Sequence, residues 1–104
     1  MKKKLIHCIW KANYRGIKRQ FKYYTPRKSD EPLTVYTDNP QVIIFLHKLG
    51  LDINQQDSVG NTRIMDAIAR GEWAVVQTLL SLGVDLDILN FSGEDAFSYA
   101  CVWD

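Results

Sequence analysis

Apolar residues recur three and four positions apart in short segments of the chain, which is the spacing of one helix face. The clearest pair of segments spans residues 62–70 and 73–82. Thr62 is the first residue of the first segment and Gly71 follows that segment, so we expect the Thr62 hydroxyl to cap a helix that Gly71 ends. The spacing predicts two short antiparallel helices joined by a tight turn.

The same spacing predicts further helices upstream of this pair. A short helix passes through Val35 and Tyr36, and Pro40 begins a longer helix that ends at Gly50. Proline suits the first helical turn because its missing N–H would have no partner there. Residues 6–21 fit a degenerate helix pair of the same kind.

The second half of the chain repeats with a period of 33 residues. The matched pairs are Leu46 and Leu79, Leu49 and Leu82, Gly50 and Gly83, Asp52 and Asp85, Gly60 and Gly93, and Ala67 and Ala100. A fixed period of this size is typical of stacked repeat proteins, in which each unit buries its apolar face against the next. Such proteins usually bind other macromolecules, so the period favours recognition over chemistry.

Residues 62–71 read Thr-Arg-Ile-Met-Asp-Ala-Ile-Ala-Arg-Gly, which resembles the ankyrin signature Thr-Pro-Leu-His-x-Ala-Ala-x-x-Gly. Residues 75–85 resemble the second-helix pattern of the same repeat. Arg63 replaces the usual Pro and Met65 the usual His, so we expect slightly weaker helix initiation and one hydrogen bond fewer. The resemblance covers nearly the whole chain and implies an all-α, helix-turn-helix solenoid of about three and a half repeats.

The resemblance also implies one repeat domain over the whole chain. Its parts are a degenerate N-terminal unit 1–24, repeats 25–54 and 55–87, and a half repeat 88–104. Two interpretations of the half repeat stay open. Phe97, Tyr99 and Trp103 form a natural end cap, or the chain is the N-terminal fragment of a longer ankyrin scaffold.

Charge is distributed very unevenly along this chain of 104 residues, 46% of them apolar and 24% charged. Residues 1–28 carry seven Lys and three Arg without a carboxylate, hence +10, whereas residues 29–104 carry three basic and twelve acidic residues, hence −9. No segment has the pattern of a secretory signal or the length of a membrane span. Cys8 and Cys101 are expected to be reduced packing residues, which favours a cytoplasmic protein.

No residue pattern indicates catalysis or metal binding. The chain has no Gly-rich phosphate loop and no Cys, His, Asp or Glu set with metal-ligand spacing. His7 and His47 each stand alone, and Asp52, Asp85 and Asp87 occupy repeat positions where a carboxylate fixes a turn. The sequence therefore predicts a protein that is not an enzyme and uses no cofactor, metal or small-molecule substrate.

The ankyrin resemblance implies that a protein partner binds the turn tips and the ridge of first helices. The residues at those positions are Arg27, Lys28, Asp30, Ser58, Val59, Asn61, Ala69, Arg70, Phe91, Ser92, Glu94 and Trp103. Leu89, Phe91 and Trp103 are apolar at positions that normally face solvent. They are either a binding hot spot or the surface that a missing C-terminal repeat would cover. Small ankyrin-like proteins of this size resemble immunity proteins that bind and neutralise a toxin.

Cations and aromatic rings alternate in the N-terminal unit. The cations are Lys11, Arg15, Lys18, Arg19 and Lys22, and the rings are Trp10, Tyr14, Phe21, Tyr23 and Tyr24. This combination is typical of proteins that bind single-stranded nucleic acid. Three interpretations stay open: a solvated cap in which Trp10 and its apolar neighbours only pack, a site for an acidic protein, or a nucleic-acid site.

Overall fold

The computed structural model describes residues 2–24 and 32–103, with side chains for residues 3–24 and 32–100. Within these ranges the chain is helical and contains no strand. The elements are α1 (Lys2–Trp10), α2 (Tyr14–Phe21), the 3-10 helix η1 (Leu33–Tyr36), α3 (Pro40–Lys48), α4 (Arg63–Arg70), α5 (Trp73–Ser81) and α6 (Ala96–Trp103). The predicted all-α class is confirmed.

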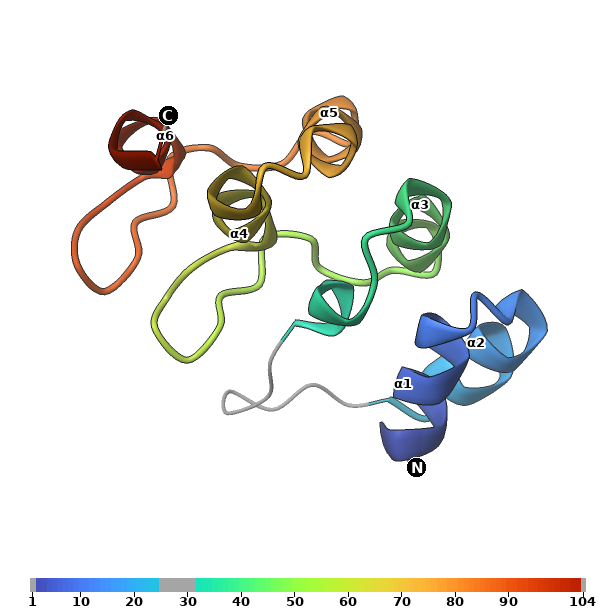
Figure 1. The fold of residues 1–104 in the computed structure, drawn as a ribbon. Coiled ribbons are helices and arrows are strands. Elements are labelled where there is room, and N and C mark those ends of the chain that lie inside the picture. The colour runs from blue at the N-terminus through green and yellow to red at the C-terminus, as the bar shows by residue number, and fades with distance from the viewer. Residues whose placement is uncertain (1, 25–31, 104) are drawn as a thin grey trace.

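The helices lie in two rows that run along the longest dimension of the molecule, which measures 39 × 26 × 20 Å. Figure 1 shows α1, η1, α4 and α6 in one row and α2, α3 and α5 in the other. Neighbours pack within each row, α4 on α6 and α3 on α5, and α1–α2 and α4–α5 pack between rows. The ankyrin assignment, the number of repeats and their boundaries stay predictions.

Local signals set the limits of α4 and α5. Gly71 follows α4 in the left-handed conformation, with φ of 71°, and ends the helix as predicted. Thr62 is the N-cap residue of α4, but the predicted hydroxyl cap is wrong, because this side chain makes no capping hydrogen bond. Its Oγ1 is buried without a hydrogen-bond partner, since the side chain packs inward with 1% exposure.

The turn between α1 and α2 differs from the turn between α4 and α5. Asn13 is the N-cap residue of α2 and its side chain accepts a hydrogen bond from the Gly16 amide. The left-handed residue is Ala12, with φ of 55°, immediately before this N-cap. The chain therefore reverses through a left-handed Ala12 followed by a capping Asn13, whereas Gly71 itself is the left-handed residue after α4.

Two hydrophobic cores lie along the molecule, and α3 contributes to both. One core gathers Ile43 with buried residues of α4 and α5, and the other gathers Val42 and Leu46 with buried residues of α1 and α2. Trp10 is 68% exposed, so it does not pack as the solvated-cap interpretation requires. Ile9 occupies the inward position of α1, and the next residue lies about 100° further round the helix.

The turns before α4 and α6 have the same backbone geometry 33 residues apart. Asp57 accepts hydrogen bonds from the amides of residues 59 and 61, and Asn90 accepts from the amides of residues 92 and 94. Gly60 and Gly93 both have positive φ, 86° and 80°. Asp52 and Asp85 likewise each accept from the amide two residues on, which confirms their predicted turn-fixing role.

Hydrogen bonds join these two turns directly. Phe91 donates its amide to the Val59 carbonyl at 3.2 Å, and the Asn90 side-chain amide donates to Asn61 Oδ1 at 2.9 Å. Gln56 Nε2 donates to the carbonyl of Leu89 at 2.8 Å. The turns therefore form a hydrogen-bonded ladder along one edge of the molecule.

Asp95 immediately precedes α6 and accepts a hydrogen bond from the Ser98 amide at 2.8 Å. This bond, with another from the Ser98 side chain, holds the pKa of the Asp95 carboxyl below its ordinary value. The carboxylate also lies at the positive end of the helix dipole, which favours its charged form.

Candidate protein-binding surface

A hollow of about 420 Å³ lies where the ends of α1 and α4 meet the segment between η1 and α3 and the start of α5. Its walls are formed mainly by Trp10, Tyr36, Asp38, Arg63, Arg70 and Glu72. These residues come from three helices and two connecting segments, which only the stacking of the helices brings together.

Arg63 lines this hollow with a buried side chain that is 2% exposed. Its Nε donates to the Thr34 carbonyl at 2.9 Å and its Nη2 donates to the Thr37 carbonyl at 3.1 Å. Nη2 also lies 2.9 Å from Glu72 Oε1, and Nη1 lies 3.5 Å from Asp66 Oδ2. Two carboxylates thus balance the charge and two carbonyls accept hydrogen bonds, whereas Nη1 is buried without a hydrogen-bond partner among the described residues.

This network connects three parts of the fold. Thr34 belongs to η1, Thr37 to the segment before α3, Asp66 to α4, and Glu72 immediately precedes α5. A buried guanidinium is costly unless its charge is paired. Because Arg63 contacts η1, the segment before α3 and Glu72 at once, it connects η1 with the α4–α5 pair beside the hollow.

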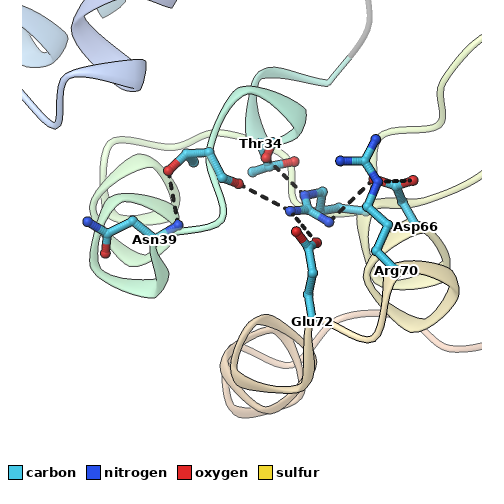
Figure 2. A network of polar contacts seen from close by, with 7 residues as sticks. Thr34, Asn39, Asp66, Arg70 and Glu72 are labelled. Atoms are coloured by element: carbon cyan, nitrogen blue, oxygen red, sulfur yellow. Dashed lines mark hydrogen bonds and ion pairs between the residues drawn. The ribbon is translucent and has the colours of Figure 1, made fainter.

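Arg70 lies above this network and is held in place on one side only. Its Nε is 3.3 Å from Asp66 Oδ1, while its side chain is 59% exposed. Asp66 also pairs with Arg63, so the buried network orients the exposed guanidinium (Figure 2). The two terminal amino groups of Arg70 make no described contact, and this end of a guanidinium binds carboxylates bidentately.

Trp10 presents a large exposed ring at the α1 side of the same hollow. Lys11 Nζ lies 4.6 Å from the centre of this ring, in the range of a cation–π contact. Tryptophan, tyrosine and arginine are the residue types that most often dominate the binding energy of protein interfaces. Trp10, Tyr36 and Arg70 line one hollow, so the site has the composition of an interface hot spot.

The structure places the predicted turn-tip residues away from this hollow, along the turn ladder. Ser58, Val59, Phe91 and Ser92 are exposed, Phe91 by 74%. Asn61 and Glu94 instead accept hydrogen bonds from the Asn90 side chain, so both brace the turns. Partner contact by these residues stays a prediction.

Several other predicted positions add little to the hollow. Ala69 is half-buried on α4, and Lys11 reaches the site only through the Trp10 ring. Arg27, Lys28 and Asp30 lie outside the described residues, and the side chain of Trp103 does too. The remaining N-terminal cations, Arg15, Lys18, Arg19 and Lys22, are exposed on or next to α2, elsewhere on the surface.

Arg63 is the important residue that is missing from the predicted site, because in the sequence it is only a departure from the ankyrin proline. A signal was present: Arg63, Asp66 and Arg70 have alternating charge at spacings of three and four residues, so they share one helix face. The inward orientation of Arg63 depends on carbonyls of another element, which the sequence does not display.

Among the described residues, no group of three or more His, Cys, Asp or Glu side chains is arranged to hold a metal ion. None of the described helices combines the length and apolar character needed to span a bilayer. Cytoplasmic localisation stays a prediction.

Comparison with known proteins gives one informative similarity. No family model matches the chain. The chain is 32% identical over 57 residues to a Fowlpox virus (strain NVSL) protein whose name describes it as an ankyrin repeat protein. The match covers 55% of this chain and 13% of that much longer protein. Over this part of its length, the chain is similar to an ankyrin repeat protein.

Proposed function

We propose that this chain is a non-catalytic protein-interaction module, an ankyrin-type solenoid of about three and a half repeats. The hollow bordered by Trp10 and Arg70 is its docking site. The observation that carries the proposal is the exposed Arg70 guanidinium, oriented by Asp66 and the buried Arg63, across a hollow from the exposed Trp10 ring.

The mechanism is rigid docking. Because Asp66 already orients Arg70, little side-chain entropy is lost when a partner binds it. The free end of the guanidinium fits a carboxylate of the partner, and the Trp10 ring offers apolar area beside it. The partner segment therefore carries an acidic side chain next to an apolar one.

A neutralising role, as in immunity proteins that inhibit a toxin, is the specific form of this proposal. The net charge of −9 over residues 29–104 supports it, because an acidic body accelerates association with a basic enzyme. In that case the association rate falls as salt rises, while the dissociation rate changes much less.

The test is quantitative capture of partners from the native source in high salt, with the whole chain as bait. We expect the double variant Trp10→Ala, Arg70→Ala to lose its partner, since truncating a hot-spot residue costs about 2 kcal/mol or more. The matched control is Trp73→Ala, Lys48→Ala, which removes another exposed Trp and one positive charge away from the hollow.

Retention of the same partner by wild type and control, with its loss from the double variant, supports the proposal. Equal recovery by all three proteins contradicts it and assigns binding to another surface, such as the turn tips at Phe91 and Ser92. Circular dichroism and thermal melting of each variant distinguish lost binding from lost folding.

A further inference from the structure

The outward surface of α2 carries cations and no carboxylate. These cations, which we name the α2 stripe, are Arg15, Lys18, Arg19 and Lys22. Their spacing of three and four residues places them on one helix face, and all are exposed, whereas Ile17 faces inward and is fully buried. In the described part of the chain, no carboxylate lies within ion-pair distance of the stripe.

Helix stability does not explain the stripe. Cations three and four residues apart repel each other and destabilise a helix, and each member of the stripe has such a neighbour. Lys18 and Arg19 in the last turn complement the helix dipole, but Arg15 lies in the first turn, at the positive end. The arrangement therefore costs stability in the free protein and fits a surface that meets an anion.

A second hollow, of about 620 Å³, opens beside the C-terminal half of this stripe. Lys18, Arg19 and Lys22 line it together with the apolar or aromatic side chains of Phe21, Tyr24 and Leu49. The rings of Phe21 and Tyr24 lie 5.7 Å apart with 30° between their planes. Its volume is in the usual range of small-ligand sites, and it combines cations with flat apolar surfaces.

Tyr23 adds an exposed ring at the end of the stripe. Its side chain is 56% exposed, and Lys22 Nζ lies 5.1 Å from the ring centre. Exposed aromatic rings beside cations stack on nucleobases of any sequence, while the cations contact the phosphates. The acidic side chains of a peptide would use the cations, but none of them stacks on the ring as a base does.

We propose that the α2 stripe and its adjoining hollow bind single-stranded nucleic acid. Phosphates lie against Arg15, Lys18, Arg19 and Lys22, and bases stack on Tyr23 or enter the hollow beside Phe21. The hollow shares no lining residue with the one bordered by Trp10 and Arg70, so this binding does not depend on the proposed protein partner.

The test measures fluorescence anisotropy of a labelled oligouridylate, about 12 nucleotides long, with the whole chain at several salt concentrations. Each phosphate contact to a single strand contributes about −0.7 to the slope of log K against log salt. The triple variant Lys18→Gln, Arg19→Gln, Lys22→Gln is expected to bind about 100-fold more weakly at 0.1 M salt, with a slope about 2 units shallower.

The matched control is Lys3→Gln, Lys4→Gln, Lys48→Gln, which removes three exposed lysines outside the stripe. It changes the net charge equally and is expected to retain most of the affinity. Tyr23→Ala is expected to bind at least about fivefold more weakly with an unchanged salt slope, because stacking is not electrostatic.

Three outcomes would overturn the proposal. The first is absence of oligouridylate binding at about 50 mM salt. The second is an equal loss in the control variant, which would mean that only net charge matters. The third is equally tight binding of an oligoglutamate peptide of matched charge with no effect of Tyr23→Ala, which would assign the surface to an acidic protein.

Discussion

Arg63 illustrates how one side chain can connect elements that lie far apart in the sequence. Its guanidinium is bonded to carbonyls 29 and 26 residues upstream and to a carboxylate at the start of α5. Replacing it leaves Glu72, which is only 19% exposed, close to the interior without its counter-ion. Leaving one member of a buried pair alone is far more costly than losing a surface pair.

We expect Arg63→Ala to lower the free energy of unfolding by about 3 kcal/mol, measured by urea denaturation. Arg70→Ala on the same helix is the matched control. Because Arg70 is mostly exposed, it should change stability by less than about 1 kcal/mol. Equal effects of the two substitutions would show that Arg63 is not a connecting residue.

The role of a single residue can be predicted when its hydrogen-bond partner lies close to it in the sequence. Asp52 and Asp85 bond to amides two residues away, and the sequence predicts their turn-fixing role. Two partners of Arg63 are backbone carbonyls 29 and 26 residues away, and every residue has a carbonyl. No residue type therefore marks Arg63 as buried.

Signals close by in the sequence largely determine where each helix begins and ends. They do not determine which helices contact one another. The predicted helices over 40–50, 62–70 and 73–82 agree with α3, α4 and α5 to within two residues, because Pro40 and Gly71 act locally. The capping of α2 by Asn13 was missed, since Asn serves equally well as a helix N-cap or a left-handed residue.

The ladder of turns gives two glycines with similar backbone conformation very different surroundings. Gly60 and Gly83 have similar positive φ, 86° and 80°. A Cβ atom on Gly60 would lie 2.6 Å from the Phe91 amide nitrogen of the next turn, whereas one on Gly83 would meet nothing within 4 Å. Substituting each glycine by alanine therefore distinguishes the cost of backbone strain from the cost of a clash between turns.

We expect Gly83→Ala to cost about 1 kcal/mol from the left-handed conformation alone. Gly60→Ala should cost at least about 1 kcal/mol more, because overpacking must displace the next turn. Chemical denaturation of both variants under the same conditions measures the difference. Equal losses would mean that the turns move apart freely.

On the scale of the whole molecule, two cores share one helix. Val42 and Ile43 are adjacent on α3 and both are fully buried, but Val42 belongs to the core with α1 and α2, and Ile43 to the core with α4 and α5. In linear assemblies of this kind, stability divides into local contributions and contributions from neighbouring units.

Val42→Ala should therefore reduce hydrogen-exchange protection mainly in α1 and α2, and Ile43→Ala mainly in α4 and α5. Each loss should reach about 2 kcal/mol or more in the affected part, as for other buried aliphatic truncations. Site-resolved amide exchange distinguishes the two patterns. A uniform loss across all helices in both variants would show one cooperative unit.

The all-α class was predictable from the sequence because hydrophobic spacing and the 33-residue period both indicate paired helices. The two hollows were not predictable, since each has walls from elements separated by tens of residues. The sequence shows that the N-terminal unit is basic. That four of its cations share one face of α2 can be stated only once the limits of this helix are known.

The ladder between the turns determines which residues at the turn tips can be exchanged. Its bonds use backbone groups and the side chains of Gln56, Asn61 and Asn90, whereas Val59 and Phe91 contribute only their backbone to these bonds and project into solvent. Evolution or an engineer can therefore exchange the apex residues to acquire a new ligand while the supporting scaffold stays intact.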